Sequence, residues 1–127
     1  MTFVFLALFA CSNKSQTSTA QTSALQTTQN LCSYKDNKEL CLGQMTKAIG
    51  SVPEMIYAHP MISTENSIQS YIQIEDEQLI VLSEQPIDCN KQFQVVGLLQ
   101  EIDLGGAPGT RGSYKNFYFS DSTIQCL

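Results

Sequence analysis

A polar tract of low complexity limits how much of this 127-residue chain can form a hydrophobic core. Residues 12–30 (SNKSQTSTAQTSALQTTQN) are almost wholly Ser, Thr, Gln and Asn, with one charged side chain and no aromatic one. A segment of this composition buries too little apolar surface to offset the entropy of ordering it, so we expect a disordered, flexible linker. The folding part is therefore residues 31–127, one small domain that would gain stability from covalent cross-links.

An apolar run precedes this linker. Phe3 to Ala10 (FVFLALFA) is far shorter than the roughly 20 residues that span a bilayer, but it has the length of a signal-peptide core. A buried N-terminal strand is the alternative, and it would have to dock alone beyond the linker. Leu8-Phe9-Ala10-Cys11 resembles a lipobox, the signal at which bacterial lipoproteins are cleaved and lipidated.

The lipobox resemblance implies a location. Residues 1–10 would be the signal peptide, Cys11 the first mature residue with palmitate-type acyl chains, and residues 11–30 the tether. Several acyl chains together anchor a protein stably, whereas a single chain binds only marginally. Ser12 in place of Asp implies an outer-membrane lipoprotein facing the periplasm, with a secreted or periplasmic protein as the alternative.

The chain has five cysteines, an odd number. With Cys11 assigned to lipid, an even set remains in an exported domain, and such a set predicts two disulfides. The four are Cys32, Cys41, Cys89 and Cys126. They contain no CxxC pair, and His59 is the single histidine, so the spacing fits a zinc site poorly and we expect no metal or cofactor. Four cysteines allow three pairings, and the sequence alone does not choose among them.

Residues 31–127 contain several short segments with strand-like patterns. Ile72 and Ile74 alternate with polar residues, and the acidic turn Glu75-Asp76-Glu77 after them predicts a hairpin whose tip is solvated. Gly97, in the middle of a long apolar segment, predicts a bulge or bend. The pattern of residues 31–42 does not decide their secondary structure. Just after them, the apolar residues have a spacing that fits a helix as well as a strand. The predicted strands are about 43–50, 70–75, 78–83, 93–102 and 114–120.

Two long loops separate these strands. Residues 51–67 contain two prolines, which push the preceding residues away from helix, and we expect their apolar side chains to cover the core. Residues 105–112 (GGAPGTRG) form a loop by composition and do not match a phosphate-binding P-loop motif. The apolar side chains expected on the core are Met55, Ile56, Met61 and Ile62.

The strand count and the central glycine bend predict an all-β fold, a small five-stranded barrel of the OB type. Val95-Val96-Gly97-Leu98-Leu99 and the preceding hairpin YIQIEDEQLIVL resemble OB-fold modules of bacterial envelope proteins. His59-Pro60-Met61 and the stretch Gly105 to Phe119 resemble small envelope lipoproteins of unknown function. The resemblance covers residues 43–126, but residues 84–92 are too short for the helix that usually lies between the third and fourth OB strands.

The OB resemblance also implies a disulfide pairing. In an OB barrel the fourth and fifth strands pair antiparallel, so the start of one lies beside the end of the other. Cys89 precedes the fourth predicted strand and Cys126 follows the fifth, which implies a Cys89–Cys126 bridge. Cys32 and Cys41 would then close a small local loop.

The OB resemblance further places the binding loops, because the loops after the first and fourth strands flank the ligand face. The first loop carries His59 and the second carries Arg111, with Tyr114 and Lys115 beside it. These four side chains are the candidate ligand contacts. Structural roles are the alternative: His59 can pack between turns, and the glycines of the loop that carries Arg111 can provide positive φ.

We therefore expect a non-catalytic, lipid-anchored envelope module that binds a protein, a peptide or a glycan. A single-stranded nucleic-acid-binding OB domain is one alternative, but the net charge of -5 disfavours it because such binding depends on Lys and Arg. A small hydrolase that uses His59 is the other. It lacks a nucleophile, because the domain cysteines are assigned to disulfides and no nucleophile-elbow motif is present.

Overall fold

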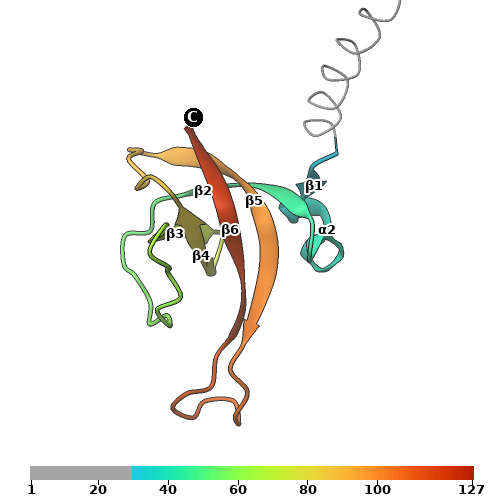
Figure 1. Cartoon of the computed structure of the whole chain (residues 1–127), viewed down its shortest axis with the longest axis vertical. Coiled ribbons are helices and arrows are strands. Elements are labelled where there is room, and N and C mark those ends of the chain that lie inside the picture. The colour runs from blue at the N-terminus through green and yellow to red at the C-terminus, as the bar shows by residue number, and fades with distance from the viewer. Residues whose placement is uncertain (1–29) are drawn as a thin grey trace, which may run out of the picture. The chain divides into compact units, whose positions relative to one another are not determined.

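The computed structural model describes residues 30–127, of which Cys32–Leu127 form one compact unit (Figure 1). The predicted signal peptide, the predicted lipidation site Cys11 and the predicted linker lie outside the described residues, apart from the end of the linker. The elements are β1 (Cys32–Ser33), α2 (Tyr34–Cys41), β2 (Met45–Ser51), β3 (Ile68–Ile74), β4 (Glu77–Ser83), β5 (Gln92–Asp103) and β6 (Lys115–Cys126).

Five of the strands pair side by side in a ring, in the order β2-β3-β4-β6-β5 and back to β2. The pairs are antiparallel except β4–β6, which is parallel. The shortest pairing in the ring is between β2 and β3, where Ser51 lies opposite Gln73. The longest pairing is between the long strands β5 and β6, which run side by side in Figure 1. The predicted all-β fold is confirmed, and the five predicted strands form the ring. The short strand β1 adds a sixth strand, which pairs parallel with β2.

The inside of the ring is filled by the apolar residues of each alternating strand pattern. In β5, for example, Phe93, Val95 and Leu99 are fully buried and Gly97 is buried as well, while the alternate residues 94, 96 and 98 are partly exposed. Because successive side chains point to opposite faces of a strand, this alternation assigns one face to the core. The core cluster consists of Tyr34, Cys41, Ala48, Ile72, Leu79, Val81, Phe93, Val95, Leu99 and Phe119.

The predicted irregularity at Gly97 is confirmed, and the extra residue lies in the neighbouring strand. Val96 pairs with Thr123 and Leu98 pairs with Ser120, so β6 has one more residue than β5 at this point. Asp121, with a φ of 50°, lies in this bulge. The bulge inverts the in-and-out alternation of β6, which explains why the predicted strand ended at residue 120 although β6 continues to Cys126.

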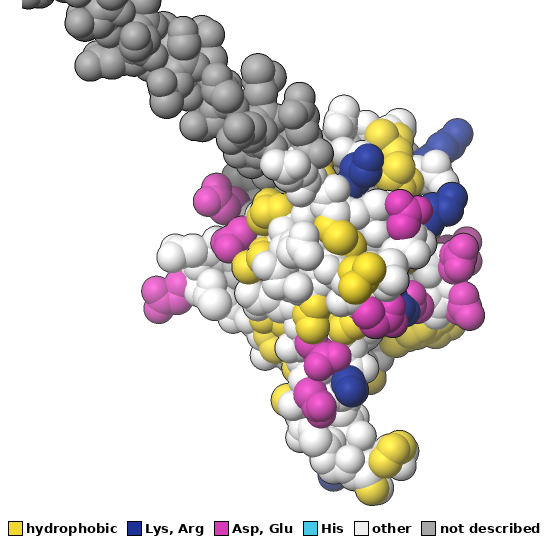
Figure 2. Space-filling view, turned by 90° about the vertical axis from the view of Figure 1, so that its right-hand side faces the viewer, with side chains coloured by type: hydrophobic (Ala, Val, Ile, Leu, Met, Phe, Trp, Pro, Cys, Tyr) yellow, Lys and Arg dark blue, Asp and Glu magenta, His cyan; other side chains and the backbone are white. Residues whose placement is uncertain are grey.

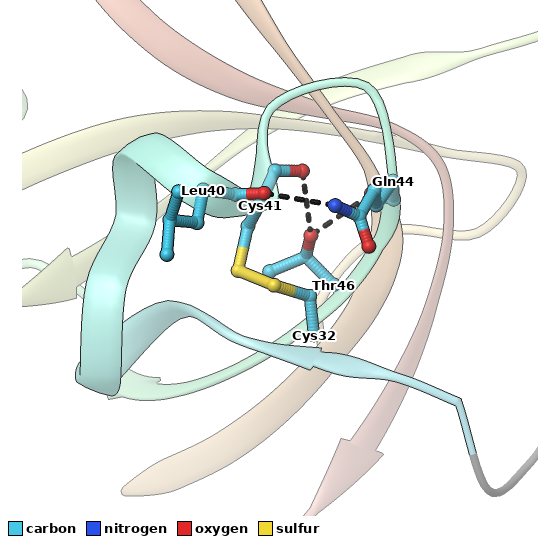
Figure 3. The surroundings of a disulfide bond; sticks show 5 residues. All are labelled: Cys32, Leu40, Cys41, Gln44 and Thr46. Carbon is cyan, nitrogen blue, oxygen red and sulfur yellow. Dashed lines mark hydrogen bonds between the residues drawn. A yellow bond between two sulfur atoms is a disulfide. The ribbon is translucent and has the colours of Figure 1, made fainter.

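Residues 32–41, whose secondary structure the sequence did not decide, close one end of the ring. They form β1 and the short helix α2, which is interrupted at Asn37. The Cys32–Cys41 disulfide joins the two ends of this segment, and Tyr34 packs against Phe119 with ring centroids 6.0 Å apart. Beside the disulfide, the buried Thr46 hydroxyl lies 2.8 Å from the carbonyl oxygen of Gln44 (Figure 3). The segment therefore works as a cross-linked plug for the ring.

The turn between β3 and β4 also contacts this plug. Lys38 Nζ lies 2.6 Å from Glu77 Oε2, and the Tyr34 hydroxyl donates to Glu77 Oε1 at 3.2 Å. The prediction that all three acidic residues of the turn are merely solvated is therefore wrong for Glu77. Its position at the start of β4 brings it beside α2, where a lysine and a phenol satisfy its carboxylate.

At the other end of the ring, the second disulfide joins Cys89 to Cys126. Both bridges match the pairing that the OB resemblance implied. Ile87 and Cys89, in the segment between β4 and β5, pack against the core cluster. Residues 84–91 contain no helix, as their length predicted.

The loop between β2 and β3 differs from the prediction. Met55, Ile56 and Met61 are 71%, 58% and 77% exposed, so they do not cover the core. Ile62 alone of the four predicted residues is partly buried. The prediction was wrong because backbone and polar groups, rather than these apolar side chains, attach the loop to the outer face of the sheet.

Candidate functional site

The loop of residues 52–67 lies on the outer face of the β3–β4 hairpin. Gln69, Tyr71 and Gln73 on β3 lie opposite Leu82, Ile80 and Gln78 on β4, so these six residues share that face. Ile80 is fully buried and Leu82 is 8% exposed, although neither belongs to the core cluster inside the ring. The loop therefore covers a face that would otherwise be open.

His59 forms the centre of the contact between the loop and the sheet. Its ring stacks on Tyr71, with centroids 4.8 Å apart and 26° between the planes. Its Nδ1 lies 2.7 Å from the Tyr114 hydroxyl, and its Nε2 lies 2.9 Å from Gln78 Oε1. We call His59, Tyr71, Gln78 and Tyr114 the loop clasp.

The hydrogen-bond partners of Gln78 indicate which tautomer a neutral His59 ring adopts. Gln78 Oε1 accepts a hydrogen bond from the Tyr57 backbone N–H at 2.8 Å, so this atom is the amide oxygen and not the nitrogen. An amide oxygen only accepts, so His59 Nε2 carries a hydrogen and donates to it. In the neutral ring Nδ1 then accepts from the Tyr114 hydroxyl.

Gln78 is the buried anchor of the loop clasp, with 3% of its surface exposed. Its Nε2 donates to the Met55 carbonyl oxygen at 2.9 Å and to Gln73 Oε1 at 3.1 Å. Together with the two bonds to Oε1, every donor and acceptor position of the amide has a partner. A buried amide with all its bonds satisfied holds a loop in one position, whereas loss of a partner leaves a desolvated polar group.

Tyr114 brings the second predicted loop to the clasp. It follows the glycine-rich segment, and its backbone oxygen accepts from the Leu104 N–H at 2.8 Å. Burial raises the pKa of the Tyr114 phenol above its ordinary value, although the hydrogen bond with Asn116 acts in the opposite direction. The phenol therefore keeps its proton at neutral pH and can donate it to His59.

A second attachment lies further along the loop. Gln69 Oε1 accepts from the Ile62 backbone N–H, and Gln69 Nε2 donates to the Pro60 carbonyl oxygen, both at 2.9 Å. Gln69 and Gln78 thus play equivalent parts on neighbouring strands. Neither glutamine was predicted as a functional residue from the sequence, because polar residues that alternate with apolar ones are common on any outward strand face. The available signal was a Gln on the outward face of each of two paired strands.

The attached loop turns large apolar side chains to the solvent. Met55, Ile56 and Met61 belong to this group, and so does Tyr57, which is 52% exposed. Hydrophobic side chains also reach the surface elsewhere, and Figure 2 shows one face on which they lie among acidic side chains. The loop differs because four such side chains lie within seven residues. We call Met55, Ile56, Tyr57 and Met61 the apolar loop surface.

The structure separates the four candidate ligand contacts into two groups. His59 and Tyr114 contact each other inside the loop clasp, half-buried. Arg111 lies exposed in the loop after β5, which extends away from the ring in Figure 1. Lys115 begins β6 opposite Asp103. Within residues 30–127, neither Arg111 nor Lys115 makes a side-chain hydrogen bond or an ion pair.

Comparisons with protein-family models, curated proteins and solved structures found no match for the chain. In the described part, no helix has the length and apolar character needed to cross a bilayer.

Proposed function

We propose that this protein is a non-catalytic binding module of the bacterial envelope, anchored through lipid on Cys11, that contacts a protein partner through the apolar loop surface. The observation that carries the proposal is the combination of a firmly attached loop with exposed apolar side chains at its outer side. Exposed apolar groups gathered on an ordered loop are typical of interaction sites, because solvation of such groups is unfavourable without a partner.

Two disulfides in the described domain support an extracytoplasmic location. Cys32–Cys41 and Cys89–Cys126 use every cysteine of that domain. Disulfides persist in the periplasm and outside the cell and are rare in the reducing cytosol. The lipobox at Leu8 to Cys11 would account for export and for the fifth cysteine.

The geometry gives less support to the nucleic-acid alternative. OB folds bind oligonucleotides on the outer face of their second and third strands, which correspond to β3 and β4 in this ring. Here the loop covers that face, and Tyr71 already stacks on His59. The net charge of -5 adds to the argument, since phosphate binding depends on Lys and Arg.

The hydrolase alternative also has little support. A general base needs a ring nitrogen within reach of a nucleophile's proton. Both ring nitrogens of His59 are already used, one by Tyr114 and one by Gln78. His59 is therefore better explained as the residue that holds the loop.

Site-specific photo-crosslinking in intact cells tests the proposal. A photoreactive amino acid at Ile56 is expected to give one discrete crosslinked species in the membrane fraction. The matched control is Ile49, which is also exposed but lies on β2. The Met55→Ser and Met61→Ser changes together should abolish the Ile56 product without changing the melting temperature. Equal products from both positions, or none from Ile56, would contradict the proposal.

A further inference from the structure

We propose that a groove beside the second half of β6 binds an extended peptide with basic side chains, which adds to β6 as a further strand. This site lies apart from the apolar loop surface and goes beyond the function proposed above. It rests on the pairing of β6 and on the shape and charge of the groove.

The first observation is a free strand edge. The last paired position between β4 and β6 is Ser83 with Ser122, whereas β6 continues to Cys126. On its other side β6 stays paired with β5 as far as Phe93 and Cys126. Residues 123–125 therefore have a strand neighbour on one side only, whereas Cys126 lies beside Cys89, with the two Cα atoms 5.5 Å apart.

The alternation of hydrogen-bonded pairs between β5 and β6 shows which backbone groups of β6 point away from β5. The Leu127 N–H donates to the Gln92 carbonyl oxygen at 3.0 Å. Antiparallel pairs alternate between hydrogen-bonded and non-hydrogen-bonded positions, so Gln125 and Thr123 also bond to β5. The N–H and C=O of Ile124 then point away from β5. β4 ends at Ser83, and no backbone hydrogen bond joins Ile124 to a loop or a turn among residues 30–127.

The free edge borders a groove of about 670 Å³, within the range of small-ligand and peptide sites. The groove exists because residues 84–91 form no helix, and the chain turns instead toward the Cys89–Cys126 disulfide. Its walls come from the end of β4, from the loop before β3 and from β6. The lining is Thr64, Asn66, Ser67, Leu82, Ser83, Glu84, Gln85, Asp121, Ser122, Thr123 and Ile124.

The charge of the lining selects the partner. Glu84 and Asp121 are its charged members, and it contains no Lys, Arg or His. It also has no aromatic side chain on which a base could stack. Carboxylates beside a free strand edge suit a peptide backbone that carries Lys or Arg, because strand addition supplies the main-chain hydrogen bonds and charge supplies the selectivity.

The test is a titration of the oxidised, ¹⁵N-labelled full chain with heptapeptide libraries, followed by amide chemical shifts. In the first library alternate positions are Lys or Arg and the others vary among Val, Ile and Thr. The second replaces the basic residues with Glu. The third is the basic library with alternate backbone nitrogens methylated, which removes the strand-pairing donors.

We expect the basic library, at millimolar concentration, to shift the amides of residues 121–124, and the acidic and N-methylated libraries to leave them unchanged. Glu84→Gln with Asp121→Asn should weaken binding about fivefold. Asn tolerates the positive φ at residue 121, so the fold is kept. Met61→Ser, on the other surface, should leave peptide binding unchanged.

Three results would overturn the proposal. One is the absence of shifts at residues 121–124 with the basic library. Another is equal binding of the N-methylated library. The third is a shift of these amides with protein concentration alone, which would make a second copy of the chain the occupant of the groove.

Discussion

Gly97 and Ser122 lie face to face across β5 and β6 at the bulge that shapes the ring. A β-carbon on Gly97 would lie 2.5 Å from Ser122 Oγ and 2.8 Å from the backbone oxygen of Ser120. Real β-carbons do not approach atoms so closely, and Ser120 contributes backbone that cannot rotate away. The glycine therefore allows β6 to bulge toward β5 without separating the two strands.

The first prediction concerns this close approach. Gly97→Ala should lower the free energy of unfolding by about 1–3 kcal/mol, the usual cost of overpacking a tight site. Adding Ser122→Gly should recover part of the loss and no more, because the Ser120 carbonyl stays in place. Urea denaturation of the oxidised protein measures both effects. A Gly97→Ala protein as stable as the wild type would show that the strands are not in contact here.

The second prediction concerns the loop clasp. His59→Ala leaves Gln78 Oε1 short of one donor and removes the stacking on Tyr71, so we expect a loss of about 1–3 kcal/mol. Tyr114→Phe removes one hydrogen bond and should cost about 1 kcal/mol. The more specific measurement is hydrogen exchange, in which the amides of Tyr57 and Ile62 should lose protection in His59→Ala.

Arg111→Ala is the matched control for the loop clasp, because Arg111 is exposed and makes no side-chain hydrogen bond within the described residues. Its stability and amide protection should equal those of the wild type. If the Tyr57 amide remains protected after His59→Ala, the histidine does not hold the loop.

The third prediction separates the two disulfides. Their sequence separations are 37 for Cys89–Cys126 and 9 for Cys32–Cys41. On the chain-entropy estimate, a loop of the longer size is stabilised by about 4 kcal/mol and one of the shorter size by about 2.5 kcal/mol. Replacing Cys89 and Cys126 with Ala should therefore cost about 4 kcal/mol in urea denaturation.

Replacing Cys32 and Cys41 adds a packing loss to the entropic one, because Cys41 is fully buried in the core. Comparing Ala with Val at position 41, in a Cys32→Ala background, isolates that packing loss. A cost below 1 kcal/mol for the Cys89/Cys126 pair would contradict the assigned bridge.

The fourth prediction is a loss of stability in alkali. Burial raises the pKa of the Tyr34 phenol, and the charge of Glu77 and its hydrogen bond add to the rise. Burial also raises the pKa of Tyr114. The folded protein thus holds these protons more tightly than the unfolded chain does, so the stabilisation is complete below about pH 10 and is lost as the pH rises above it.

We expect the melting temperature to fall between about pH 10 and pH 12. Tyr34→Phe, which has no proton to lose, should make that fall shallower. An identical pH profile for wild type and Tyr34→Phe would show that Tyr34 does not contribute to the alkaline transition.

The sequence predicted the parts of this fold that follow from local patterns. The strands through Ile72 and Val95 and the irregularity at Gly97 follow from alternation and from glycine chemistry. The disulfide pairing came from the OB resemblance. The second half of β6 was missed because the bulge at Asp121 inverts the alternation on which strand prediction depends.

The functional surfaces were harder to predict because they depend on contacts between distant segments. His59 was predicted as a ligand contact from its place in the loop after the first OB strand, whereas Gln78, 19 residues away, occupies its Nε2. Met55 and Met61 were assigned to the core because they are apolar, yet the polar attachment of the loop turns them outward. The groove beside Ile124 depends on where β4 ends relative to β6, which no local pattern reveals.

The proposed export, lipidation and oxidation of the chain can be tested together by the intact mass of the protein extracted from its native cells with detergent, with and without reductant. We predict a chain that begins at Cys11, carries acyl chains, and gains the mass of four hydrogens when its two disulfides are reduced. An unprocessed chain without acyl mass, whose mass does not change on reduction, would contradict the proposed envelope function.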